Sequence, residues 1–139
     1  MKKVLFYTPG TEERSRQLQK LTEDAGDISF RRVAETEAGQ MIGWLAGREG
    51  FVYLPLAQAA APAEEILLLD GFEEEELRSF LYYLRSRFFA VKLKAVVTGH
   101  NAAWRLADLA LALEEEHRAL HPGGPAAAPG EKEAPGTRS

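Results

Sequence analysis

Six polar or aromatic side chains that could support chemistry follow short apolar runs, the pattern of buried strands that end in loops. They comprise two hydroxyls, a carboxylate, an imidazole, an amide and an indole, namely Thr8, Asp70, Thr98, His100, Asn101 and Trp104. In an open parallel sheet, ligands bind outside the carboxyl ends of the strands. We therefore predict that these residues form a small polar binding site, and we assign none of them a catalytic role.

Helix capping is the competing interpretation of the same residues. Asp70 followed by Glu73 resembles a capping box, and Thr11 and Asn101 are residue types that begin helices. Caps satisfy the backbone N–H groups that a helix leaves free at its start. Under this interpretation the loops hold the fold together and bind no ligand.

Enzyme motifs are absent from the sequence, which lacks G-x-S-x-G, a phosphate-binding loop, G-x-G-x-x-G and H-E-x-x-H. An aspartate and a threonine at successive strand ends, here Asp70 and Thr98, resemble the pattern of phosphoacceptor receiver domains. Such domains also need an acidic pair after the first strand to hold Mg²⁺, and Thr8-Pro9 stands there instead. We expect a non-catalytic protein without a cofactor, and a small-molecule binder or weak enzyme is the alternative.

A metal site is also not expected. The chain has no cysteine, which excludes thiolate ligands. Glu114, His117 and His121 share one face of the last predicted helix at spacings of three and four residues. His117 also belongs to the apolar stripe of that helix, so one helix with two histidines is a weak signal.

Two outward stripes of large side chains predict an interaction surface. On the third predicted helix and its end, the stripe consists of Arg78, Tyr82, Arg85 and Phe89. On the last helix, Leu111 and Trp104 lie away from the leucine stripe. Because arginine, tyrosine and tryptophan anchor protein interfaces, we expect a protein partner or a homodimer.

The elements that position these residues repeat a βαβα pattern twice, over residues 1–50 and 64–121. Continuous apolar strands separated by helices favour a three-layer α/β domain with a mostly parallel four-stranded sheet. Right-handed crossovers then predict the strand order 2-1-3-4. An α+β two-layer sandwich with antiparallel pairs is the alternative.

Composition limits what the protein can do. The chain has 139 residues and a net charge of -4, which argues against nucleic-acid binding through charge alone. No apolar run approaches the length of a signal peptide or a membrane span, so we expect a soluble cytoplasmic protein. Residues 122–139 are rich in Pro, Gly and Ala, which predicts a disordered tail after a single domain over residues 1–121.

Three segments resemble a family of small bacterial proteins known as domain of unknown function 3783. They are LLLDGFEEEEL (67–77), LKAVVTGHNAAW (93–104) and EEEHRAL (114–120), so the resemblance covers about residues 65–120. The pattern often has Ser or Thr before the acidic cluster, where this chain has Glu73. The resemblance implies no activity, substrate or cofactor, but it draws attention to Thr98-x-x-Asn101-x-x-Trp104.

Overall fold

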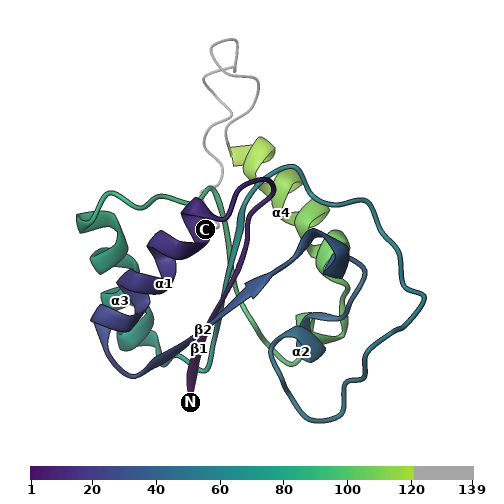
Figure 1. Ribbon diagram of the computed structural model, residues 1–139, viewed down its shortest axis with the longest axis horizontal. Coiled ribbons are helices and arrows are strands. Elements are labelled where there is room, and N and C mark those ends of the chain that lie inside the picture. The colour runs from purple at the N-terminus through teal and green to yellow at the C-terminus, as the bar shows by residue number, and fades with distance from the viewer. Residues whose placement is uncertain (121–139) are drawn as a thin grey trace.

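The computed structural model describes residues 1–120, in which strands and helices alternate along the chain (Figure 1). The first half contains β1 (Lys2–Tyr7), α1 (Glu13–Ala25), β2 (Ile28–Val33), the 3-10 turn η1 (Glu35–Glu37) and α2 (Ile42–Leu45). The second half contains β3 (Ile66–Asp70), α3 (Glu74–Ser86), β4 (Leu93–Val96), the 3-10 turn η2 (Asn101–Ala103) and α4 (Leu106–Leu120). His121 and the predicted tail over residues 122–139 lie outside the described residues.

The four strands form one sheet in the predicted order β2-β1-β3-β4. β1 pairs with β2, and β3 with β4, in parallel. The central strands β1 and β3 are antiparallel, so the prediction of a mostly parallel sheet is wrong for this pair. Its physical reason is that an apolar run such as Val4–Tyr7 or Ile66–Leu69 is buried on both faces and fits either direction.

The direction of β3 separates the strand ends. Tyr7 pairs with Ile66 and Lys3 with Asp70, so β3 begins beside the end of β1. The carboxyl ends of β1 and β2 therefore lie at one end of the sheet, and those of β3 and β4 lie at the opposite end.

Apolar residues are buried on both faces of the sheet. α1 and α3 cover one face, and α2 and α4 cover the other (Figure 1). The α1–α3 side buries Val4, Phe6, Leu18, Leu67, Leu69, Phe80, Leu84, Phe89 and Val91. The α2–α4 side is centred on Leu5, Tyr7, Ile42, Leu45, Ile66, Leu68, Leu93, Leu106 and Leu109. Alternate residues of β1 and β3 thus contribute to opposite cores, as the two-residue period of a strand requires.

The two halves repeat one local structure after their second strand. In the first half, the Glu37 carboxylate accepts a hydrogen bond from the Ala34 N–H at 2.9 Å. In the second half, the Asn101 side-chain oxygen accepts one from the Thr98 N–H at 2.9 Å. Both acceptors lie three residues after the donor and close the turn that leads into the next helix. The two halves therefore share this turn as well as a parallel strand pair, β1–β2 in one and β3–β4 in the other.

The segments that follow the repeated turns contact each other directly. The Ile42 N–H donates to the Trp104 carbonyl at 2.9 Å, and the Leu106 N–H donates to the Gln40 carbonyl at 3.0 Å. These two hydrogen bonds flank an isolated antiparallel bridge between Met41 and Arg105. This contact places the beginnings of α2 and α4 side by side. It joins the two halves outside the sheet as well as within it.

One expected helix start needs correction. The last helix begins at Leu106 rather than after Asn101, because Asn101 opens η2 instead. Between β2 and β3 the short elements η1 and α2 are separate, and residues 51–54 have no strand structure. Within residues 1–120, no helix is both long and apolar enough to cross a membrane.

Candidate functional site

Asp70, the predicted acid of the polar site, is held by an arginine from the first half. The Arg48 guanidinium donates hydrogen bonds to both carboxylate oxygens, at 2.8 and 3.4 Å, and to the Val97 carbonyl at 3.3 Å. The hydrogen bond to Asp70 raises the pKa of Arg48, so this cation stays charged. Asp70 therefore ties the end of β3 to the segment that follows α2.

Thr98 and Asn101 form a capping box. The Thr98 hydroxyl accepts a hydrogen bond from the Asn101 N–H at 3.1 Å, which reciprocates the bond from the Thr98 N–H to the Asn101 side chain. The Asn101 amide also donates to the Val96 carbonyl at 2.9 Å. The exposed His100 ring lies 5.7 Å from the ring of the half-buried Trp104 in an edge-on arrangement. This geometry favours capping over chemistry for Thr98 and Asn101.

Thr8 does not join the other predicted site residues. It follows β1, whose carboxyl end lies at the opposite end of the sheet from Asp70 and Thr98. The buried Thr8 hydroxyl instead donates to the Glu65 carboxylate at 2.8 Å. The expectation of one six-residue site is corrected here, because it required β1 and β3 to be parallel.

Glu65 is the centre of a polar network that the sequence analysis did not identify. The Arg14 guanidinium donates to both of its carboxylate oxygens, at 2.9 and 2.8 Å, and to the Ala90 carbonyl at 2.6 Å. Arg14 also lies over the Phe89 ring, 4.1 Å from its centroid. Burial alone would raise the pKa of Glu65, but the hydrogen bonds from Arg14 and Thr8 lower it.

The predicted interface residues are divided between two sides of the molecule. Arg78, Tyr82 and Arg85 are exposed on α3, and Leu111 is exposed on α4, which covers the other face of the sheet. Phe89 is only 6 % exposed and packs into the core, so its assignment to an outward stripe is wrong. The reason is that α3 ends at Ser86 and the chain turns before Phe89.

Phe88 takes the exposed position that was expected for Phe89. Its φ of 61° is left-handed, and its side chain is 94 % exposed. The N–H of Phe88 donates to Arg85 and that of Phe89 donates to Leu84, which together form a Schellman motif. Glycine usually occupies the left-handed position of this motif, so periodicity could not identify a phenylalanine there.

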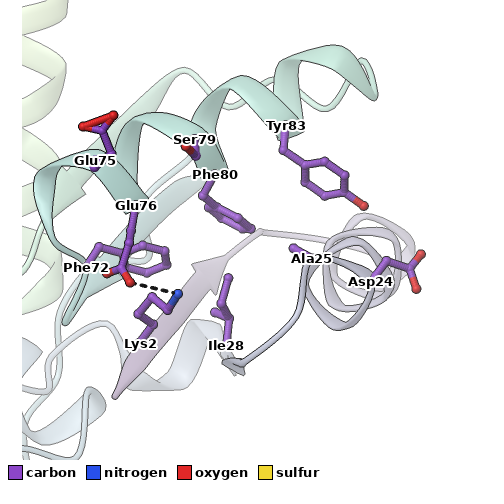
Figure 2. A pocket seen from close by; sticks show the side chains of 10 residues that line it. All are labelled: Lys2, Asp24, Ala25, Ile28, Phe72, Glu75, Glu76, Ser79, Phe80 and Tyr83. Carbon is purple, nitrogen blue, oxygen red and sulfur yellow. Dashed lines mark ion pairs between the residues drawn. The ribbon is translucent and has the colours of Figure 1, made fainter.

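A groove lies between the end of α1 and the beginning of α3, with a volume of about 470 Å³ (Figure 2). Aromatic rings of Phe72, Phe80 and Tyr83 extend from the α3 side towards α1, and Ile28 lies beside them. The Phe72 and Phe80 ring centroids are 5.5 Å apart. We refer to this groove as the aromatic groove.

Carboxylates surround the aromatic groove. Asp24 and Glu75 point outwards at its rim, whereas Glu76 pairs with Lys2 at 3.3 Å (Figure 2). The pKa of Glu76 is lowered, chiefly by its hydrogen bond from the Glu73 N–H and also by Lys2. The groove therefore combines an apolar floor with an acidic rim, which suits an apolar side chain next to a positive charge.

A second groove, of about 530 Å³, lies at the other end of α1 and α3. Its charged lining includes Arg16, Lys20 and Arg87, and Phe88 lies beside Arg87. We refer to it as the basic groove. The two grooves share Asp24 and extend from it towards opposite ends of one surface, which we call the α1–α3 face.

Charge is segregated along the α1–α3 face because the two helices are antiparallel neighbours. Acidic residues gather where α1 ends and α3 begins, namely Glu23, Asp24, Asp27, Glu73, Glu74, Glu75 and Glu76. Basic residues are in excess towards the other end, where Arg16, Lys20, Arg85 and Arg87 outnumber Glu12 and Glu13, both of which pair with Arg16. The acids in the first turn of α3 and Arg85 in its last turn are stabilised by the helix dipole, whereas Glu23 and Asp24 at the end of α1 oppose theirs, so helix stability explains the pattern on α3 and not on α1.

Residues 65–120, which span β3 to α4, match the model of a family described as Domain of unknown function (DUF3783). This match confirms the resemblance seen in the sequence. No curated protein and no solved structure matches the chain. Within residues 1–120, no group of three or more histidines and acids is placed to hold a metal ion.

Proposed function

We propose that this protein is a non-catalytic protein-binding module and that its binding surface is the α1–α3 face. The aromatic groove carries this proposal. Its floor is formed by Phe72, Phe80 and Tyr83, and exposed carboxylates surround it. Aromatic pockets with polar rims are typical of protein interfaces.

The alternative of a small-molecule site at the strand ends has less support. Asp70 is bound by Arg48, and Thr98 and Asn101 bond to each other and to the backbone. Their polar groups stabilise the fold. Thr8, at the other end of the sheet, cannot complete that site.

Site-specific photo-cross-linking tests the proposed surface. A photoreactive amino acid replaces Ser79, which is exposed and lines the aromatic groove, and irradiation is carried out in cells that produce the protein. We expect adducts with a defined segment of one polypeptide that contains lysine or arginine. Adding Asp24→Lys and Glu75→Lys should suppress these adducts, because both changes reverse the charge of the rim.

A matched probe at Leu111 is the control, because this exposed residue lies on α4. It should give few or no adducts. Equal cross-linking at positions 79 and 111, or no polypeptide adduct at position 79, would contradict the assignment of the α1–α3 face.

A further inference from the structure

We infer that the polypeptide bound by the α1–α3 face is a second copy of this chain, in a symmetric dimer. This inference rests on the proposed function and names the partner of the same surface. The evidence consists of the charge distribution along the face and the conformation of Phe88.

The charge of the α1–α3 face is complementary to itself. The charged lining of the aromatic groove consists of three acidic residues, Asp24, Glu75 and Glu76, and one basic residue, Lys2. In the basic groove, Arg16, Lys20 and Arg87 outnumber two acids, Glu13 and Asp24, of which Asp24 lines both grooves. Two copies that meet face to face can therefore place the aromatic groove of each opposite the basic groove of the other.

Symmetry and charge together select one arrangement. A two-fold axis in the interface plane can lie across the helices or along them. An axis along the helices would place like grooves opposite each other, where equal charges repel. An axis across the helices places acidic and basic ends opposite each other at two equivalent contacts.

Phe88 supplies an apolar anchor for this arrangement. A bulky residue in the left-handed region is strained, and a side chain that is 94 % exposed gains almost no burial within one chain. Phe88 lies at the basic groove, which faces the partner's aromatic groove in the selected dimer. Insertion into that groove would bury the ring against other aromatic rings, with Arg87 beside the acidic rim.

Sedimentation of the purified full chain tests the inference. The wild type should be dimeric at roughly 0.1 mM protein, and Phe88→Ala should raise the dimer dissociation constant by at least about tenfold. Leu111→Ala is the matched control, because it removes an exposed apolar side chain from α4 and should leave the dissociation constant unchanged. A monomeric wild type, or a dimer that Leu111→Ala weakens and Phe88→Ala does not, would overturn the inference.

Charge exchange tests the orientation of the two copies. One variant carries Asp24→Lys and Glu75→Lys, and the other carries Lys20→Glu and Arg87→Glu. Each variant alone would place like charges together at both contacts, so each should be mainly monomeric. An equimolar mixture has complementary charges at both contacts and should form heterodimers. Mixing that restores no association would contradict the selected orientation.

The two proposals fail in different ways. A monomeric wild type that still gives an adduct at position 79 with another polypeptide would end the dimer inference and leave the binding module intact. A monomeric wild type with no polypeptide adduct would end both. A dimer whose adduct at position 79 maps to the segment around Phe88 of the second copy supports both.

Discussion

At the residue scale, two residues on the α1–α3 side of the sheet have unusual environments. Glu65 is a partly buried carboxylate that connects Arg14 with Thr8. Phe88 has a backbone conformation that glycine usually adopts. Glu65 holds an ionic network within the fold, so its substitution should lower the free energy of unfolding. Phe88 gains little from folding, so its substitution by glycine should raise the free energy of unfolding.

Glu65 should make stability depend on pH. Its pKa is lowered in the folded protein relative to the unfolded chain, so its stabilisation is complete above the unfolded value of about 4.3. This stabilisation is lost as the pH falls through the folded pKa. Glu65→Gln should lower the free energy of unfolding by about 2 kcal/mol near pH 7. The difference from the wild type should shrink as the pH is lowered below about 4.3.

Urea unfolding at several pH values measures this effect. Thr8→Val removes one hydrogen bond to Glu65 and keeps Arg14, so its pH dependence should lie between those of the wild type and Glu65→Gln. A constant difference between the wild type and Glu65→Gln over the whole pH range would show that the carboxylate charge contributes nothing.

Phe88→Gly should stabilise the isolated chain. Glycine adopts a φ near 61° without steric cost, and the lost side chain is almost fully exposed. We expect the free energy of unfolding to rise by about 1 kcal/mol, measured by urea unfolding at protein concentrations too low for association. Phe88→Ala retains a Cβ and should give a smaller gain. A clear loss of stability in Phe88→Gly would show that the ring contributes to the fold.

At the element scale, the repeated turns after β2 and β4 connect the strands to the helices on the α2–α4 side. Each turn is closed by a side chain that accepts a hydrogen bond from the backbone three residues earlier, Glu37 in one half and Asn101 in the other. The segments that follow the two turns also bond to each other through backbone groups. Their side chains therefore contribute to stability more than to an exposed site.

Asn101→Ala should destabilise the protein by about 1–2 kcal/mol, because it removes the bonds to Thr98 and Val96. Trp104→Ala should cost about 2 kcal/mol, because the half-buried indole packs against the α2–α4 core. Neither change should alter association through the α1–α3 face. Stability is measured by urea unfolding and association by sedimentation. An unchanged stability in Asn101→Ala would remove the structural role assigned to its side chain.

At the scale of the whole molecule, the antiparallel pair β1–β3 joins two similar halves into one sheet. The segment that matches the family model begins at residue 65 and therefore lacks β1. In an isolated segment 65–120, β3 would lack the pairing partner β1 on one side, and its apolar face would lack contact with Val4 and Phe6 in the shared core. Such an edge is unstable in water and prone to pair with other chains.

The chain should consequently unfold as one unit. Trp44 and Trp104 lie in different halves and provide separate fluorescence probes. The single-tryptophan variants Trp104→Phe and Trp44→Phe should each show one urea transition, and in each the fluorescence transition should coincide with that from circular dichroism. The isolated segment 65–120 should not form a folded monomer, as judged by its NMR spectrum. Two separate transitions, or a well-dispersed monomer spectrum of the segment, would contradict this prediction.

The sequence by itself determined the four strands and the main helices, although not where the last helix begins, because their signals are local. Apolar runs marked the strands, the spacing of Leu77, Phe80, Leu81, Leu84 and Phe88 marked α3, and the βαβ repeats with right-handed crossovers predicted the strand order. Phe88 was wrongly included in this buried stripe, because it lies beyond the end of α3 and is exposed. Asn101 was recognised as a capping residue for the same reason, since a cap depends on residues three positions apart. The capping box expected at Asp70 and Glu73 is wrong, because Asp70 binds Arg48 and the Glu73 N–H donates to Glu76.

Only the tertiary structure decided how the two halves meet. A strand buried on both faces has no directional pattern, so the sequence did not predict that β3 follows the connection over residues 46–65 antiparallel to β1. That choice separated Thr8 from Asp70 and brought the acidic end of α1 next to the acidic start of α3. It also follows that the aromatic groove, which needs both helices, has no signature within either half of the sequence.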